Sequence, residues 1–264
     1  MTTDPLALVL WAYLASAAVM ALLWWIQRIV RNASIADVGW CVTLFGVVLW
    51  YAMQVPGAPA RRLLLALLAA GYGLRLGLAI LFTRVLGQPE DPRYARIRQQ
   101  WGADSERNLF LYFQLQAAAV PLFSLPFLVV MQNPRPTFSL WEYAGVGLWL
   151  AGVIGETVAD AQLADFKRQP WNRSHVCRTG LWYYSRHPNY FFEWVHWWSY
   201  VVMAVGLPNG WLTWVGPAAM GWALLKVTGV PHAEAQALRS RGDEYRHYQL
   251  TTNVFIPWFP RRHG

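Results

Sequence analysis

Seven apolar stretches, each long enough or nearly long enough to cross a bilayer, set the strongest limit on what this chain can fold into. A bilayer core about 30 Å thick requires roughly 20 apolar residues in a helix. The stretches cover approximately Leu6 to Gln27, Ile35 to Met53, Leu63 to Thr83, Leu109 to Met131, Leu140 to Ala159, Asn189 to Leu207 and Trp211 to Val230. The sequence therefore predicts an all-α, polytopic integral membrane protein with seven transmembrane helices.

The composition supports the same class of protein. Of the 264 residues, 56% are hydrophobic and 14% charged, whereas a soluble domain carries about 25% charged residues. This excludes disordered, collagen-like, coiled-coil and disulfide-framework proteins. We expect one domain over 1–264, in which 5–160 hold spans one to five, 161–188 form a cytoplasmic segment, 189–230 hold spans six and seven, and 231–264 form a cytoplasmic tail. Cys41 and Cys177 lie in unlike surroundings, so a structural disulfide between them is not expected.

The positions of lysine and arginine predict the orientation. The connections after spans one, three and five and the C-terminal tail hold 17 of the 22 basic residues, and the connections after spans two and four hold three. Basic loops stay in the cytoplasm, so the N-terminus is expected outside and the C-terminus in the cytoplasm. The net charge of +8 is then explained by topology, and no nucleic-acid partner is expected. The segment from Gly87 to Arg107 is expected to be cytoplasmic, and a solvated basic loop is one open interpretation of it.

Several ionisable residues fall within the predicted spans. An ionisable group inside a span usually faces a cavity and marks function. The residues of this kind are Asp37, Arg75, Glu156, Asp160, Glu193 and His196. They favour a hydrophilic pocket that opens to the cytoplasm, although interhelical ion pairs such as Asp37 with Arg75 remain the alternative. No metal site is expected, because the Glu193 and His196 pair lacks the further ligands of a di-iron bundle.

The run from Gly180 to Tyr190, GLWYYSRHPNY, is the most informative stretch. It places a proline at the start of a span, where a missing N–H is tolerated. Basic residues precede it: Lys167, Arg168, Arg173 and Arg178. Such a cluster beside a helix N-terminus can hold phosphates, and the alternative is a basic anchor with interfacial aromatic residues. The chain has no Walker A or GxGxxG signature, so any nucleotide cofactor must bind among the helices.

Ordered motifs along most of the chain resemble one family. They are Ser34–Trp40 (SIADVGW), Gly73–Leu76 (GLRL), Glu90–Tyr94 (EDPRY), Asp160 with Gln162 and Phe166, Gly180–Tyr190 with Glu193, and the tail from Asp243, Glu244 and Tyr245 to Pro257. In these motifs the sequence resembles the membrane steroid 5α-reductase family, in particular its proteobacterial homologues. The RHPNY run alone would not be specific, because isoprenylcysteine-type methyltransferases and membrane sterol reductases resemble the sequence there too.

The resemblance implies NADPH-dependent reduction of the 4,5 double bond of a 3-oxo-4-ene steroid by a seven-helix protein. We expect a multi-pass monomer in a bacterial inner membrane, with membrane lipids and an apolar enone as its partners. Asn189 and Asp160 match positions that hold the cofactor. Further cofactor contacts are expected from Glu156, Lys167, His175 and Arg178 in and near the segment 161–188, and from Glu234 and Tyr248 in the tail.

The resemblance also implies the residues that act on the substrate. Asp37 and Tyr72 match the acid and the tyrosine that grip the steroid carbonyl, and Glu193 and Arg75 are expected to bind substrate. The chain departs from the family in having Asp rather than Glu at position 37 and Ala36 rather than Gln before it. A tyrosine hydroxyl polarised by the acid would stabilise negative charge on the carbonyl oxygen as hydride from the nicotinamide reaches the β carbon.

Two other functions remain open from the sequence. A membrane methyltransferase of isoprenylcysteine or phospholipid type, which uses S-adenosylmethionine, would share the RHPNY run and a cytoplasmic pocket but would leave Asp37 and Tyr72 without a role. A non-enzymatic lipid or steroid carrier would use the same cavity without oxidising NADPH.

Overall fold

The computed structural model describes residues 4–172 and 174–261, so Arg173 of the basic cluster lies outside the described residues. Within these ranges every regular element is a helix and there are no strands, which confirms the all-α prediction. The chain divides into two compact units, Met1–Phe138 with Gly206–Val215, and Ser139–Val205 with Gly216–Gly264.

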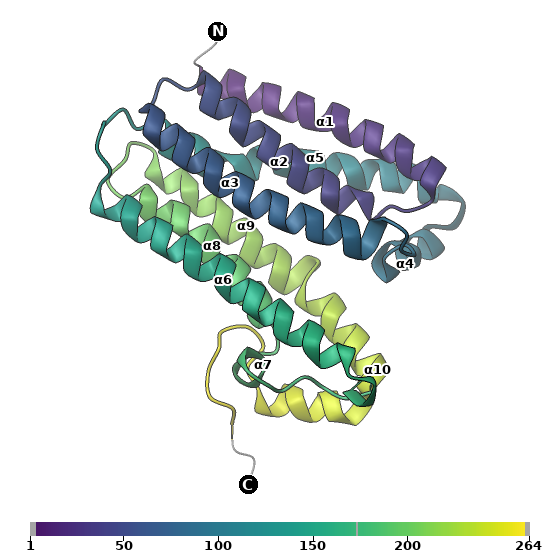
Figure 1. Cartoon of the computed structure of the whole chain (residues 1–264). Helices are drawn as coiled ribbons and strands as arrows, with labels where there is room; N and C mark the ends of the chain where they lie inside the picture. The colour runs from purple at the N-terminus through teal and green to yellow at the C-terminus, as the bar shows by residue number, and fades with distance from the viewer. Residues whose placement is uncertain (1–3, 173, 262–264) are drawn as a thin grey trace. The chain divides into compact units, whose positions relative to one another are not determined.

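The first unit is built on four long helices that lie alongside one another (Figure 1). They are α1 (Pro5–Val30), α2 (Ile35–Gln54), α3 (Pro59–Ile80) and α5 (Ser105–Met131). The shorter elements are η1 (Leu81–Val85), α4 (Pro92–Trp101), η2 (Gly102–Asp104) and η4 (Gly210–Trp214). Proline stands in the first turn of α1, α3 and α4, where its fixed φ favours the helix and its missing N–H leaves no bond unmade.

The turn between α2 and α3 is held tightly against the end of α5. A Cβ on Gly57 would lie 1.7 Å from the carbonyl oxygen of Met131, so only glycine fits there. Arg61 is 1% exposed, and its guanidinium donates to the carbonyl oxygens of Asn133, Arg135 and Thr137 at 3.0, 2.6 and 3.0 Å. This arginine therefore has a structural role: it joins the start of α3 to the chain that follows α5.

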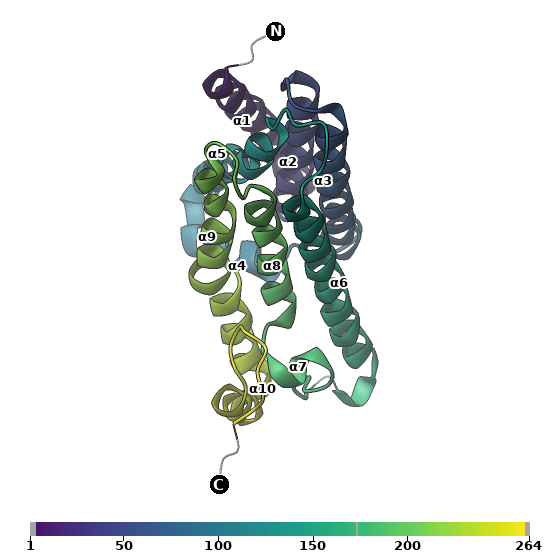
Figure 2. The same cartoon turned by 90° about the vertical axis from the view of Figure 1, so that its left-hand side faces the viewer.

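The second unit contains the remaining helices. They are α6 (Leu140–Arg168), η3 (Pro170–Asn172), α7 (Leu181–Tyr184), α8 (Pro188–Met203), α9 (Val215–Trp222), η5 (Ala223–Val227) and α10 (Val230–Thr251). The first residue of α9 belongs to the first unit. Helix α8 lies between α6 and α9 (Figure 2), and Trp194 of α8 donates its indole N–H to the carbonyl oxygen of Pro217 at 2.9 Å. Helix α10 bends at Gly242, which has a φ of 48°.

Glycines on one face of α6 allow α8 to approach closely. A Cβ on Gly152 would lie 2.7 Å from Cβ and 2.8 Å from the backbone nitrogen of His196, and a Cβ on Gly155 would lie 2.3 Å from the ring of Phe192. Small residues serve this purpose in membrane helix pairs, where close packing rather than the hydrophobic effect drives association. The two contacts also fix α6 and α8 as antiparallel neighbours.

Five helices are long and apolar enough to cross a membrane: Pro5–Val30, Ile35–Gln54, Pro59–Val85, Pro92–Met131 and Leu140–Arg168. They contain the first five predicted spans. The sixth predicted span forms α8, which has 16 residues. The seventh is divided among η4, α9 and η5. The chain thus has the character of a multi-pass membrane protein, and by length and composition the described helices supply five candidate spans rather than seven.

Candidate functional site

The carboxylate of Asp37, in the first turn of α2, is held by the first turn of α4. Its Oδ2 accepts a hydrogen bond from Nη2 of Arg93 at 2.6 Å, and its Oδ1 accepts one from the hydroxyl of Tyr94 at 2.8 Å. The Asp37 side chain is 17% exposed and Tyr94 is 1% exposed. Asp37 is thus ion-paired with Arg93, a residue that lies outside the predicted spans.

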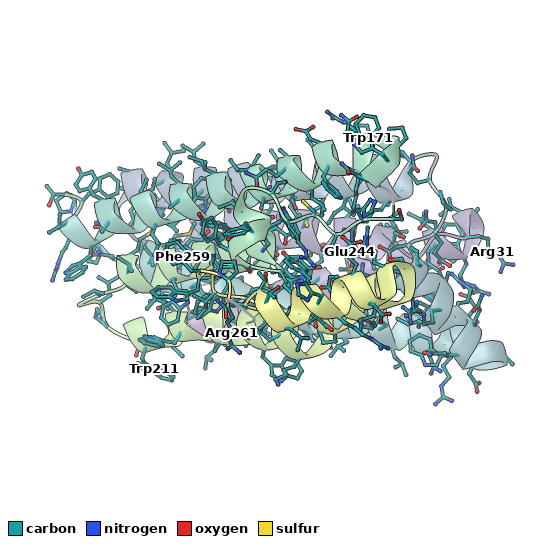
Figure 3. The ribbon with its side chains drawn as sticks, turned by 90° about the horizontal axis from the view of Figure 1, so that it is seen from below. Arg31, Trp171, Trp211, Glu244, Phe259 and Arg261 are labelled. Carbon is teal, nitrogen blue, oxygen red and sulfur yellow. The ribbon has the colours of Figure 1, made fainter. Side chains whose placement is uncertain are left out.

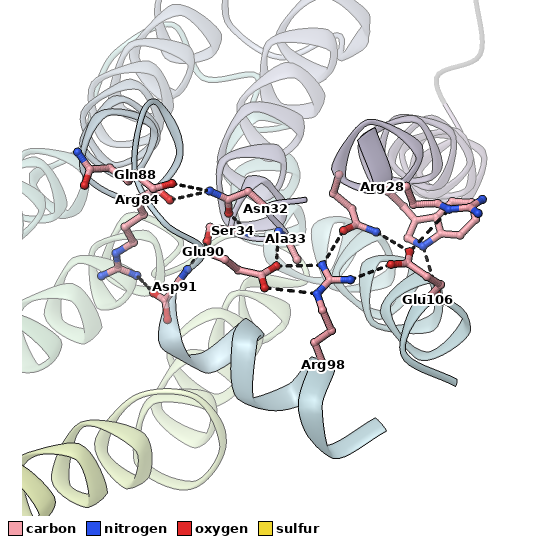
Figure 4. Close-up of polar contacts among 12 residues, drawn as sticks. Arg28, Asn32, Ala33, Ser34, Arg84, Gln88, Glu90, Asp91, Arg98 and Glu106 are labelled. Atoms are coloured by element: carbon pink, nitrogen blue, oxygen red, sulfur yellow. Dashed lines mark hydrogen bonds and ion pairs between the residues drawn. The ribbon is translucent and has the colours of Figure 1, made fainter. Parts of the chain in front are cut away.

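Helix α4 is fixed in place by further polar contacts (Figure 4). Arg98 donates to Glu90 at 3.0 Å and to Glu106 at 2.7 Å, and the backbone N–H of Ala33 donates to Glu90 at 2.8 Å. Asp91 caps the helix by accepting from the backbone N–H of Arg93 at 2.9 Å. The segment from Gly87 to Arg107 therefore contains an anchored helix, and the solvated-loop interpretation is wrong for residues 92–101.

Tyr72 and Arg75 lie one turn apart on α3. The guanidinium carbon of Arg75 is 5.5 Å from the centre of the Tyr72 ring, a cation–π distance, and Tyr72 is 5% exposed. A Cβ on Gly77 would touch Cβ of Cys41, and one on Gly73 would touch Phe45. In that antiparallel register Tyr72 lies level with Gly46, which is about 13 Å farther along the α2 axis than Asp37 at 1.5 Å per residue.

In the second unit, Asn189 and Asp160 meet directly. Nδ2 of Asn189, in the first turn of α8, donates to Oδ1 of Asp160 on α6 at 3.0 Å. The Asn189 Oδ1 atom is buried and accepts no hydrogen bond from the described residues. A buried carbonyl oxygen of this kind costs free energy unless it finds a donor. The arrangement leaves an acceptor for a ligand amide or hydroxyl.

The GLWYYSRHPNY segment is docked on the end of α6. The backbone N–H of Leu181 donates to Oε1 of Gln162 at 2.9 Å, and the Trp182 indole donates to the carbonyl oxygen of Ala159 at 2.9 Å. Gly180 has a φ of 57° and packs against the Gln162 amide. These contacts bring the segment beside Asp160.

Glu234 on α10 is engaged by protein groups. Its carboxylate accepts from Nε of Arg186 at 2.7 Å and from Gln249 at 2.8 Å, and it lies 3.4 Å from Nε2 of His187. Burial opposes its ionisation, but the hydrogen bonds from His187, Arg186 and Gln249 and the charge of Arg186 outweigh burial and lower the pKa of Glu234 to about 2. In this structure Glu234 holds α10 against the turn formed by Arg186, His187 and Pro188, which we call the RHP turn.

Two predicted residues of the segment 161–188 contact Glu244 of the tail. His175 Nδ1 lies 3.3 Å from its carboxylate, and Arg178 donates to its backbone oxygen at 3.0 Å. The Arg178 guanidinium also lies 5.3 Å from the ring centre of Tyr248. Tyr248 donates its hydroxyl to the carbonyl oxygens of Trp182 and Ser185. Burial, followed by the effect of Tyr245, raises the pKa of Tyr248 above its ordinary value, so the hydroxyl stays protonated as a donor.

The remaining predicted residues lie on α6 and α8. Glu156 is 4% exposed and lies one turn before Asp160. Glu193 is half-buried, one turn after Asn189, and the antiparallel register of α6 and α8 places Glu156 and Glu193 at the same level. Lys167 is exposed in the last turn of α6. No group of three or more His, Cys, Asp or Glu side chains that could hold a metal occurs in residues 4–172 and 174–261.

A family profile described as "Protein of unknown function (DUF1295)" matches residues 23–252. The chain belongs to the DUF1295 family. This family is associated with steroid 5α-reductase-like membrane proteins. No curated protein and no solved structure matches the chain.

The structure of this DUF1295 protein adds residues to which the sequence analysis gave no role. Arg93 and Tyr94 hold Asp37, Arg186 holds Glu234, and Glu244 joins His175 to Arg178. All four belong to motifs visible in the sequence, EDPRY, RHPNY and the tail motif DEY. The motifs therefore indicated that these residues take part in the fold or the site. Only the three-dimensional contacts reveal which residue each of them binds.

Proposed function

We propose that this DUF1295 protein is a membrane oxidoreductase that reduces the 4,5 double bond of 3-oxo-4-ene steroids with NADPH, as a steroid 5α-reductase does. The observation that carries the proposal is the Asn189–Asp160 pair, with its buried, unsatisfied Asn189 Oδ1. The association of the family with steroid 5α-reductase-like proteins supports the same reaction class.

The residues of the second unit fit a dinucleotide. Asn189 Oδ1 would accept from an amide or hydroxyl of the cofactor, and the exposed side chains of Lys167 and His175 would face its phosphates. Arg178, held by Glu244, would supply a fixed positive charge. NADPH supplies the hydride when bound. In this proposal Glu234 and Tyr248 act by holding α10 on the RHP turn, and Asp160 orients Asn189. Glu156, one turn before Asp160 on α6, stays a proposed cofactor contact.

In the first unit, Tyr72 would donate its hydroxyl to the carbonyl oxygen of the enone. Negative charge develops on that oxygen during hydride transfer, and a fixed donor stabilises it. The guanidinium of Arg75 over the Tyr72 ring would favour this shift of charge. The Asp37 carboxylate lies farther along α2, and its ion pair with Arg93 neutralises its charge. Water would then protonate the α carbon.

The decisive experiment incubates the detergent-purified protein with NADPH and a panel of 3-oxo-4-ene steroids. We expect NADPH oxidation that depends on steroid, and a product two mass units heavier. Parallel binding measurements with NADPH and with S-adenosylmethionine separate this function from methyl transfer. Binding of S-adenosylmethionine without NADPH binding would refute the reductase proposal.

We also propose that α8 and the segment η4–α9–η5 act as spans six and seven, with the N-terminus outside and the C-terminus in the cytoplasm of a bacterial inner membrane. The support is the 17 to 3 distribution of basic residues. Because Arg61 is buried against backbone carbonyls, it carries little of the opposing signal. Reporter fusions at Asn209 should give a periplasmic signal, and fusions after Arg168 a cytoplasmic one; a cytoplasmic signal at Asn209 would overturn the seven-span topology.

A further inference from the structure

Four aromatic side chains form an exposed patch on the second unit. They are Tyr183 and Tyr184 of α7 and Trp258 and Phe259 of the segment after α10, and we call them the aromatic patch. Each is between 37% and 69% exposed. Their ring centres lie 5.1 Å apart for Tyr183 and Tyr184, 5.7 Å for Tyr184 and Phe259, and 6.2 Å for Trp258 and Phe259. A contiguous cluster of exposed aromatic rings is a candidate interaction surface.

The backbone holds the patch in this outward arrangement. The N–H of Trp258 donates to the carbonyl oxygen of Tyr184 at 3.0 Å, and the N–H of Arg186 donates to that of Asn253 at 2.9 Å. Between them Phe255 is 7% exposed and packs against Phe191 and Trp194. The buried Phe255 thus holds the segment on the second unit, while the rings of Trp258 and Phe259 stay exposed. Figure 3 shows Phe259 and the basic Arg261 on this segment, which follows α10.

The position of α7 along α6 indicates how deep in a membrane the aromatic patch would lie. Helix α6 is long and apolar enough to span a membrane. Its apolar part ends at Val158 and Ala159, and Asp160 begins the polar part. Trp182 binds the carbonyl oxygen of Ala159 and the backbone of Leu181 binds Gln162. Helix α7 therefore lies at the position along α6 where hydrocarbon gives way to headgroups.

We propose that the aromatic patch is a membrane-interface anchor, which places the segment after α10 in the headgroup layer of the bilayer rather than in free solution. Tyrosine and tryptophan are favoured at that depth because their rings are apolar and their N–H or O–H groups remain wet. Arg261 beside the patch matches the anionic headgroups of the cytoplasmic leaflet. The anchor fixes the segment that binds the RHP turn, independently of which reaction the protein performs.

Fluorescence quenching in liposomes tests this placement. Cys41 and Cys177 are both buried, so a thiol-reactive fluorophore can be directed to an introduced, exposed cysteine, with the wild type as the labelling control. The test position is Trp258→Cys. Asp243→Cys, whose native side chain is 96% exposed on α10, is the aqueous control. Ile154→Cys, 58% exposed on α6, is the control within the hydrocarbon.

Liposomes of phosphatidylcholine and phosphatidylglycerol would carry a nitroxide either on the headgroup or at the middle of the acyl chain. We expect the label at position 258 to be quenched most by the headgroup nitroxide, the label at 154 by the mid-chain nitroxide, and the label at 243 by neither. Quenching at 258 no stronger than at 243 would overturn the proposal, as would an unquenched label at 154. Energy transfer between donor- and acceptor-labelled Trp258→Cys proteins at high lipid dilution would show instead that a second copy covers the patch.

Discussion

Asn189 and Asp160 are 29 positions apart in the chain, yet the amide of one donates directly to the carboxylate of the other at 3.0 Å. The contact is possible because α6 and α8 run antiparallel and approach closely, with glycines of α6 packed against residues of α8. The start of α8 therefore meets the polar end of α6. It leaves the amide nitrogen occupied and the amide oxygen available. The pair therefore fixes which face of the Asn189 amide can meet a ligand.

Replacement of Asn189 by alanine should weaken NADPH binding by about 1–3 kcal/mol, because a ligand donor then loses its buried acceptor. Asp160→Ala should weaken binding less, since it removes only the group that orients the amide. Titration of NADPH by fluorescence measures both effects. In the double variant the losses should not add, because the two residues act through one contact. Unchanged affinity in folded Asn189→Ala would remove this residue from the cofactor site.

Tyr72→Phe should lower kcat on the order of 10²-fold with unchanged NADPH affinity, because it deletes one donor to the developing oxyanion and keeps the ring. Arg75→Gln should lower kcat less, since it removes the charge over the ring but leaves the hydroxyl. Tyr13→Phe, at an exposed position on α1, is the matched control and should leave turnover unchanged. Full turnover by Tyr72→Phe would show that another group polarises the carbonyl.

Arg93→Gln should destabilise the protein by about 1–3 kcal/mol, because it leaves the Asp37 carboxylate partly buried without its cation. Arg107→Gln, which removes an exposed arginine near the start of α5, should change stability little. Thermal unfolding in detergent measures the difference. If Asp37→Asn in the Arg93→Gln background restores part of the lost stability, the ion pair is the cause. If the double variant is no more stable than Arg93→Gln alone, the loss comes from packing.

Glu234 should make stability depend on pH in the acid range. Its pKa is about 2 in the folded protein against an ordinary value of 4.5, so it contributes up to about 3 kcal/mol above pH 4.5. This contribution is lost as the pH falls from 4.5 towards 2, where the carboxylate becomes protonated in the folded state too. Glu234→Gln should therefore be less stable than wild type at neutral pH, and the difference should shrink towards pH 2. A difference that is constant with pH would exclude this linkage.

Gly152→Ala should destabilise the second unit by about 1–3 kcal/mol, because its Cβ would lie within 3 Å of the backbone and Cβ of His196. Gly147→Ala on the same helix is the matched control, since a Cβ there meets nothing within 4 Å. It should stabilise α6 by up to about 1 kcal/mol through helix propensity. The two melting temperatures in detergent should move in opposite directions.

The long helices could be predicted from the sequence because hydrophobic length is a local property. The predicted starts of α2 at Ile35 and α6 at Leu140 coincide with the observed ones. Helix α8 ends at Met203, four residues before the predicted end at Leu207, because the chain turns through Gly206 at a φ of 76°. The local signal for α4 was also present, since Asp91 followed by Pro92 is a typical helix start.

The partners of charged residues could not be predicted in the same way. Pairing Asp37 with Arg75 is the economical interpretation when both lie in spans, but the cation bound to Asp37 is Arg93, 56 positions away. That choice depends on how the turn before α4 folds back on residues 32–34. Likewise Glu234 fits a cofactor contact by resemblance, and only the folded tail reveals its bonds to Arg186 and Gln249.

The contact of Gly180 with Gln162 has a consequence for how sequences of this family can vary. A Cβ at position 180 would lie 2.5 Å from the Gln162 amide, and the backbone φ of 57° already disfavours other residues there. The same amide binds the N–H of Leu181. The two positions should therefore mutate together in evolution: a relative that replaces the glycine is expected to carry a shorter residue at 162, and to dock α7 on α6 without the bond from Leu181.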